Sequence, residues 1–147
     1  MLFNWLAISA MRAGMTRPRP SMGFLGRFGR SSDLRQLDAA LKALDLHPSL
    51  VAEAVKITVV NLMKDHAPGR EPPALSYGAA AEILAYCMIG ADGFAGANGD
   101  EVARQVEARI EAALKAGDSF DAQLILLTLH AGVIQPSVVD RFRLEAE

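Results

Sequence analysis

Hydrophobic residues recur at intervals of three and four over much of the chain, which is the spacing of helices that bury one face. In the clearest case the apolar stripe consists of Leu34, Leu37, Leu41 and Leu44. Segments with such a stripe opposite a charged or polar face are residues 32–45, 48–66 and 100–116. The pattern therefore predicts three amphipathic helices, each packed against the protein through one face.

Two further segments are apolar on nearly every side. Residues 76–89 contain a single charged side chain, Glu82, and residues 121–131 are mostly aliphatic. A helix without a polar face is buried by its neighbours. We therefore predict that these two helices lie inside the protein and are wrapped by the amphipathic ones. A short last helix is predicted from Pro136, a residue suited to a first helical turn, to about Phe142.

Proline and glycine mark the boundaries of these segments. Pro48 separates the first two helices, and residues 67–74 contain three prolines and a glycine, which predicts a loop. Residues 90–100 contain four glycines, and we expect them to form a flexible connector. Asp118 is the expected N-cap of the following helix, with Asp121 in the capping-box position three residues later.

These elements predict an all-α fold, a compact bundle of five to six helices that forms a single domain over residues 31–147. The composition agrees, because only 6% of the residues are aromatic and no segment alternates convincingly between apolar and polar residues as a strand would. Residues 1–30 are treated as a separate leader.

The charge is distributed unevenly between the leader and the domain. Residues 1–31 contain five arginines and no acidic residue, whereas the remainder contains 17 acidic and 10 basic residues. An acidic domain lacks the attraction for phosphates that nucleic-acid binding requires, so no nucleic-acid partner is expected. We interpret the leader as disordered or as not made natively. Alternative translation starts are Met11, Met15 and Met22.

The single cysteine, Cys87, excludes an intramolecular disulfide and a metal site with several cysteines. A reducing compartment is the default for such a chain, and we expect a soluble, cytoplasmic protein. No apolar run reaches the roughly 18–20 residues that a membrane-spanning helix needs. Residues 22–30 combine Phe24, Leu25 and Phe28 with two arginines, and weak contact with an anionic membrane surface is an alternative for them.

Three polar residues within apolar helices are the candidate catalytic or metal-binding residues. Glu82 and Cys87 lie on one predicted helix and His130 lies late on another. If the two helices pack antiparallel, these side chains could form a Cys–His nucleophile pair or a metal site. The alternative, which we favour, is that Cys87 and His130 are core residues and that Glu82 caps a loop or faces solvent. No cofactor and no metal is predicted.

The C-terminal residues 130–142, HAGVIQPSVVDRF, resemble the junction of two helices in helix-turn-helix proteins of the LacI type. Gly132 would be the turn glycine, and residues 133–143 would form the recognition segment. The resemblance implies DNA binding through Gln135, Ser137 and Arg141. The alternative is a glycine helix end followed by a short helix that begins with proline, and the acidic domain favours it.

The sequence thus contains no complete catalytic or cofactor signature, and its lead interpretation is a small non-enzymatic helical protein. We expect it to act as a protein–protein interaction or regulatory module, through a protein partner or through self-association. Its mean hydropathy of +0.18 agrees with apolar groups on the surface. The alternatives are a small enzyme or metal-binding protein that uses Glu82, Cys87 and His130, and a helix-turn-helix regulator.

Overall fold

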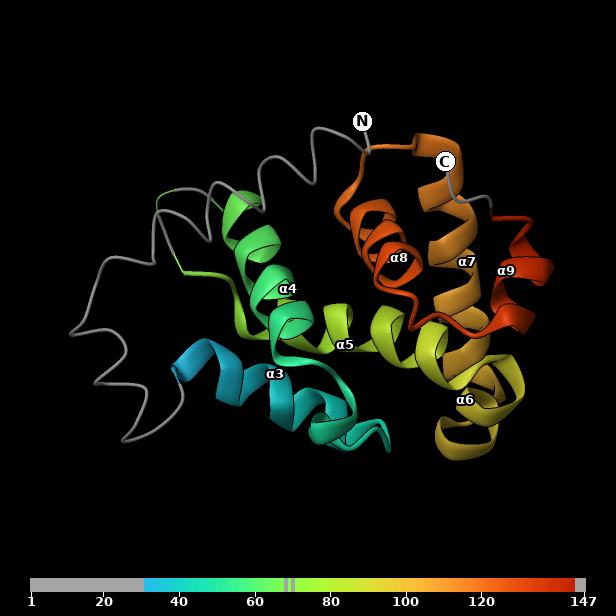
Figure 1. The fold of residues 1–147 in the computed structure, drawn as a ribbon, viewed down its shortest axis with the longest axis horizontal. Coiled ribbons are helices and arrows are strands. Elements are labelled where there is room, and N and C mark those ends of the chain that lie inside the picture. The colour runs from blue at the N-terminus through green and yellow to red at the C-terminus, as the bar shows by residue number, and fades with distance from the viewer. Residues whose placement is uncertain (1–30, 68, 70, 145–147) are drawn as a thin grey trace.

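The computed structural model describes residues 31–67, 69 and 71–144, and all regular structure in this part of the chain is helical (Figure 1). The predictions about residues 1–30 lie outside the described residues. The elements are α3 (Ser32–Ala43), the 3-10 turn η1 (Pro48–Leu50), α4 (Glu53–Asp65), α5 (Ala74–Ile89), α6 (Ala91–Asn98), α7 (Asp100–Ala116), α8 (Phe120–Ala131) and α9 (Pro136–Phe142). The all-α prediction is confirmed, and the described residues form one α-helix more than expected, α6.

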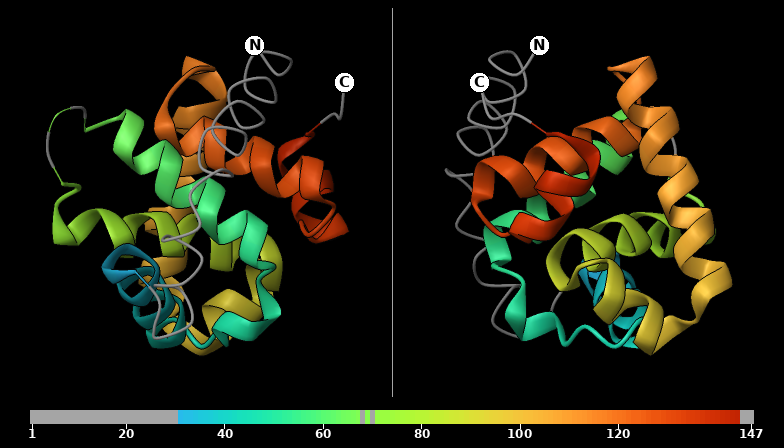
Figure 2. Two further views of the ribbon diagram at one scale, coloured as in Figure 1. Left: turned by 60° about the vertical axis from the view of Figure 1, so that its left-hand side comes forward. Right: turned by 90° about the vertical axis from the view of Figure 1, so that its right-hand side faces the viewer.

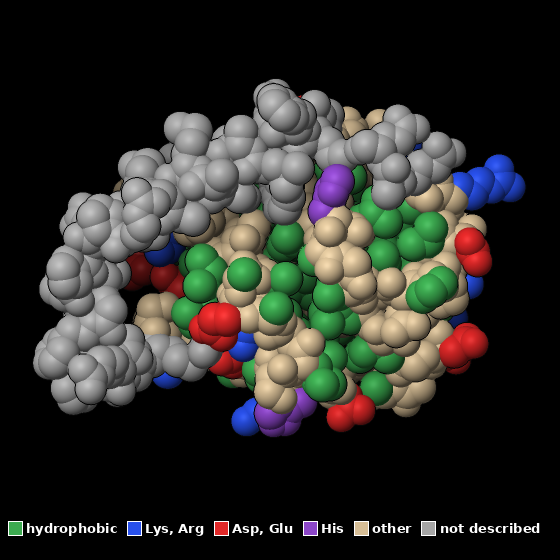
Figure 3. Space-filling model, in the orientation of Figure 1, with side chains coloured by type: hydrophobic (Ala, Val, Ile, Leu, Met, Phe, Trp, Pro, Cys, Tyr) green, Lys and Arg blue, Asp and Glu red, His purple; other side chains and the backbone are tan. Residues whose placement is uncertain are grey.

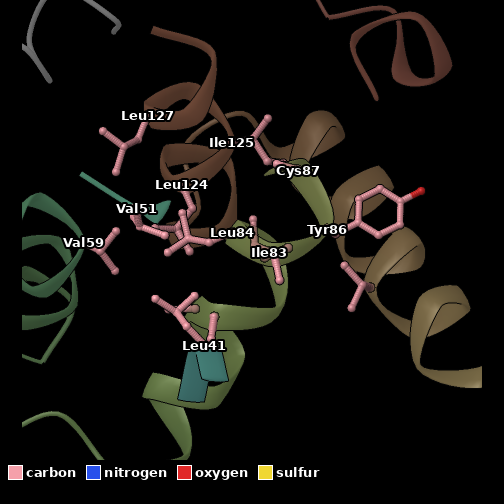
Figure 4. Packing of buried hydrophobic residues seen from close by; sticks show 14 of the residues in the cluster. Leu41, Val51, Val59, Ile83, Leu84, Tyr86, Cys87, Leu124, Ile125 and Leu127 are labelled. Carbon is pink, nitrogen blue, oxygen red and sulfur yellow. The ribbon is translucent and has the colours of Figure 1, made fainter. Parts of the chain in front are cut away.

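Helix α5 crosses the middle of the described domain, with α3 and α8 on opposite sides of it (Figures 1 and 2). Helix α4 packs against both α3 and α8, and α7 packs against α5, α6 and α8. Side chains of α3, α4, α5 and α8 meet in the part of the core shown in Figure 4. Fully enclosed examples are Leu41, Val59, Leu84 and Leu124. The predicted burial is thus confirmed for most of α5, whereas α8 is only partly buried, with Leu126 and Leu129 half-buried and His130 exposed.

The segment predicted as one helix from residue 48 to residue 66 is divided in two. Pro48 begins the short turn η1, in which the backbone N–H of Ser49 donates to the His47 ring over 3.1 Å. Val51 then adopts an extended backbone and is buried, and α4 begins at Glu53. The apolar Val51 is thus inserted into the core from a short extended link rather than from the face of a continuous helix.

The prediction of a flexible connector over residues 90–100 is wrong, because most of it forms helix α6. Phe94 is fully buried within this helix, and its ring centroid lies 5.5 Å from that of Tyr86. The side-chain amide of Asn98 donates to the carbonyl of Leu44 over 3.1 Å, which ties the end of α6 to the segment after α3. Burial of one aromatic ring and this hydrogen bond outweigh the low helix propensity of glycine.

The N-cap of α8 is Ser119 and not Asp118, because the Ser119 hydroxyl accepts from the backbone N–H of Ala122 over 3.1 Å. The capping box predicted for Asp121 is therefore wrong, and its carboxylate binds Arg109 on α7 instead. The predicted ends of the helices over residues 100–116 and 121–131 are confirmed, whereas α3 ends at Ala43 instead of residue 45 and α5 begins at Ala74 instead of residue 76. Gly117 and Gly132 end α7 and α8 in the left-handed conformation that favours glycine.

Candidate functional site

Glu82, the first of the three candidate residues, takes part in an ion cluster between α5, α7 and α8. Its carboxylate accepts from the Arg109 guanidinium over 2.8 Å, and the same guanidinium binds Asp121 through two hydrogen bonds of 2.9 and 3.1 Å. Arg109 also donates to the carbonyl of Ala79 over 3.0 Å. The Glu82 side chain is 34% exposed, so it is a half-buried ion-pair partner and not an enclosed acid.

Cys87, the second candidate, is fully enclosed within α5. Burial raises the pKa of its thiol to about 12, although a hydrogen bond with Thr128 works in the opposite direction. A cysteine acts as a nucleophile or metal ligand in its thiolate form. The thiol is therefore protonated at neutral pH, and it behaves as a small apolar side chain.

His130, the third candidate, has an exposed side chain near the end of α8, so its interpretation as a core residue is wrong. Five residues of an α-helix turn through about 500°, so Glu82 and Cys87 point roughly 140° apart on α5. The three side chains thus have different surroundings: an ion cluster, the core and the surface. Within the described ranges, no group of three His, Cys, Asp or Glu residues is placed to hold a metal ion.

The residues assigned to DNA reading in the helix-turn-helix interpretation are largely engaged with the protein itself. Gln135 donates through its side-chain amide to the carbonyl of Met88 over 2.9 Å and through its backbone N–H to the carbonyl of Cys87 over 2.8 Å. The guanidinium of Arg141 lies 3.2 Å from the Glu107 carboxylate. These contacts seat α9 on the end of α5 and on α7.

Other polar groups of the interior join pairs of helices in the same way. Tyr86 on α5 donates to Glu107 on α7 over 2.6 Å, and burial together with this hydrogen bond raises the pKa of the phenol. Lys56 on α4 is 3% exposed and donates to Asp38 on α3 over 3.1 Å. Buried charges require such partners. These groups therefore account for stability rather than for chemistry.

An apolar groove with a volume of about 340 Å³ lies between α7, α8 and α9. We call it the α7–α8–α9 groove. It is lined by Ala113, Leu114, Gly117, Ala122, Ile125, Leu126, Leu129, Phe142, Arg143 and Leu144. In Figure 3, which has the orientation of Figure 1, hydrophobic side chains gather in the space between α8 and α9. Leu114, which lines the groove, is one of the large hydrophobic residues that remain exposed, at 41%.

The groove exists because α9 is held away from α8 by its attachment to α5. Val138 is buried, and the ring of Phe142 lies edge-on to that of Tyr86 at a centroid distance of 6.1 Å. After α9 the chain turns sharply at Arg143, which has a positive φ of 56°. The turn brings Leu144 back to the groove wall, where its N–H donates to the carbonyl of Val139 over 2.9 Å.

No family model, no curated protein and no solved structure matches this chain. In the described part of the chain, the helices are either too short or too polar to cross a membrane. The cytoplasmic location stays a prediction.

The groove was not predicted from the sequence, although the apolar residues on nearly all sides of residues 121–131 were a signal for it. Helix α8 is apolar on more sides than its contacts with α4, α5 and α7 cover, and Leu126 and Leu129 remain half-buried. Their uncovered face becomes a groove wall only because α9 is seated a short distance away. That seat depends on the hydrogen bonds of Gln135 to two carbonyls of α5, which no local pattern predicts.

Proposed function

We propose that the protein is a non-enzymatic interaction module that binds another protein through the α7–α8–α9 groove. The observation that carries the proposal is the lining, in which nine of the ten residues have apolar or no side chains. Exposed apolar surface that is gathered in one concavity is typical of a binding site, whereas single exposed apolar residues are ordinary.

The dimensions of the groove support a protein segment as the ligand. Its volume of about 340 Å³ lies near the lower end of the roughly 300–1,000 Å³ of small-molecule pockets. Such a space takes a few aliphatic side chains, and the rest of the bound segment would lie along the surface. Amphipathic helices are commonly bound in this way, through side chains spaced three and four residues apart.

The use of the polar residues elsewhere also favours binding over catalysis. Glu82, Arg109 and Asp121 satisfy one another, and Cys87 is enclosed and protonated. A general base or nucleophile needs access to substrate and a suitable protonation state. The groove, in contrast, is open and carries apolar groups that a partner could bury.

The test is capture of partners from native cell extract by three forms of the tagged full-length chain. Leu126→Gln places a polar group in the groove at a half-exposed position of α8. Leu75→Gln is the matched control, because Leu75 is 88% exposed on α5 and does not line the groove. Circular dichroism and thermal unfolding establish that all three forms are folded.

We expect a stoichiometric partner with the wild type and with Leu75→Gln, and its loss with Leu126→Gln. If the partner is a second copy of the chain, light scattering will show an oligomer that only Leu126→Gln dissociates. Capture that is equal for all three forms, or absent for all three, would contradict the proposal.

A further inference from the structure

The groove contains one polar side chain, and it is a cation. Arg143 is the exposed residue that follows α9, and it lines the groove together with Phe142 and Leu144. None of the described residues forms an ion pair with it. An apolar concavity with one unpaired guanidinium is complementary to an apolar ligand that carries a carboxylate.

The other arginines of α7 and α9 differ from Arg143 in this respect. Arg104 binds Glu101, Arg109 binds Glu82 and Asp121, and Arg141 lies against Glu107. Their charges are therefore balanced by carboxylates within the domain. The charge of Arg143 is left for solvent or for a ligand.

Two exposed charges follow groove residues in the sequence. Lys115 comes directly after Leu114 on α7, and Asp118 comes directly after Gly117 in the turn before α8. Glu145 likewise comes directly after Leu144, so with Arg143 these residues sum to no net charge, and residues 32–147 as a whole are acidic. Any attraction for an anionic ligand therefore comes from the Arg143 guanidinium itself, and salt should weaken it.

On the basis of the proposed function, we propose that the partner segment is an amphipathic acidic peptide. Its aliphatic side chains occupy the groove over Leu126 and Leu129, and a glutamate or aspartate next to them binds the Arg143 guanidinium. Arginine suits this role because its planar fork can donate two parallel hydrogen bonds to one carboxylate.

The same charge argument disfavours the chain's own leader as the occupant. Residues 22–30 contain the apolar side chains of Phe24, Leu25 and Phe28, but they also contain Arg27 and Arg30 and no acidic residue. A segment with two positive charges would meet the positive charge of Arg143 without any carboxylate to balance it.

The test measures the binding of two synthetic helical peptides to the full-length protein by fluorescence anisotropy. Both peptides carry leucines at spacings of three and four, and their other faces carry glutamates in one peptide and lysines in the other. The protein variants are Arg143→Gln, Arg143→Glu and Leu126→Gln, with Leu75→Gln as the control. A third probe is a peptide of residues 22–30.

We expect the wild type and Leu75→Gln to prefer the acidic peptide. Arg143→Gln should weaken binding of the acidic peptide by about two- to fivefold, as expected for the loss of an exposed ion pair. Arg143→Glu should reverse the preference in favour of the lysine peptide, and Leu126→Gln should weaken both peptides. Raising the salt concentration should reduce the preference of the wild type.

The inference is wrong if the wild type binds the two peptides equally, if neither peptide binds, or if residues 22–30 bind more tightly than the acidic peptide. Those results leave the proposed function to be judged separately, by the dependence of extract capture on Leu126. Groove-dependent capture together with equal peptide affinities would keep the interaction module and reject the acidic partner.

Discussion

Arg109 and Arg143 are the same side chain in two opposite environments. Arg109 lies between α5, α7 and α8, where it contacts two carboxylates and one carbonyl, and its side chain is 27% exposed. Arg143 lies at the edge of the α7–α8–α9 groove among apolar residues, without an ionic partner among the described residues. In the first region, the charge of Arg109 is balanced by the carboxylates of Glu82 and Asp121. In the second, packing is incomplete and one charge is unbalanced.

The difference teaches where to look for function in this molecule. Polar residues within apolar helices attract attention in the sequence, but those at the Arg109 cluster stabilise the fold. The groove contains none of the candidate catalytic residues, yet it offers surface and charge that the domain itself does not use. We therefore propose that partner binding occurs at this groove, where α9 does not pack closely against α8.

The largest expected effect comes from making the same substitution at both arginines. Arg109→Gln leaves Glu82 and Asp121 half-buried without their cation, and it should lower the free energy of unfolding by about 2 kcal/mol. Arg143→Gln should change it by less than about 0.5 kcal/mol, because no internal contact is lost. Urea unfolding at neutral pH measures both values. Equal losses at the two positions would remove the contrast between the regions.

A second prediction concerns the closed interior around Cys87. Its pKa in the folded protein is about 12 against a reference of 9.0, so between these values the folded state binds the proton that the unfolded state releases. Stability from this group is complete below pH 9 and falls as the pH rises towards 12, by at most about 1.4 kcal/mol per pH unit. Tyr77 and Tyr86, whose pKa values are also raised, add to the loss above pH 10.

Urea unfolding of the wild type and of Cys87→Ala at pH 8, 9 and 10 checks this prediction, because Tyr77 and Tyr86 contribute equally to both proteins. The wild type should lose stability between pH 9 and pH 10, whereas Cys87→Ala should lose less over the same interval. A cavity left by the substitution lowers stability equally at each pH and so does not affect the slope. An identical change of stability with pH in the two proteins would contradict the prediction, because it would mean that folding does not raise the pKa of the Cys87 thiol.

The smallest predicted effect compares two glycines of α6. A Cβ at Gly93 would lie 2.5 Å from Cγ2 of Ile89, whereas a Cβ at Gly96 would meet no atom within 4 Å. Gly96→Ala should therefore raise the free energy of unfolding by about 0.5–1 kcal/mol through helix propensity. Gly93→Ala should fail to gain this, or should lower stability, because Ile89 must move. Thermal unfolding of both variants measures these changes. An equal gain in stability for the two variants would contradict the prediction, because it would mean that Ile89 moves at no cost.

Much of the fold was predictable because the apolar stripes are local and regular. The Leu37 and Leu41 stripe of α3 and the Val106 and Ile110 stripe of α7 are buried as their spacing predicts. Helix α6 was missed because its formation depends on the burial of Phe94 against Tyr86, a residue eight positions earlier on another helix. Helix propensity takes account of the glycines in this segment, but it does not take account of Tyr86, against which the Phe94 ring packs.

The candidate site was less predictable than the fold. The sequence shows that Glu82 interrupts an apolar helix, but it does not show that Arg109, 27 residues later, neutralises it. Likewise, Arg143 looks like any surface arginine until the seat of α9 and the left-handed turn place it on the groove. Both outcomes depend on contacts between helices that are distant in the chain.

The position of α4 has a consequence for synthesis on the ribosome. Helix α4 packs against α3, which precedes it, and against α8, which begins at Phe120, 55 residues after α4 ends at Asp65. At translation rates of about 5–20 residues per second, synthesis of these 55 residues takes roughly 3–11 s. During this time α8 has not yet been made and cannot pack against α4. A nascent chain of this protein thus displays valine, leucine and methionine side chains during that interval, when a chaperone could bind it.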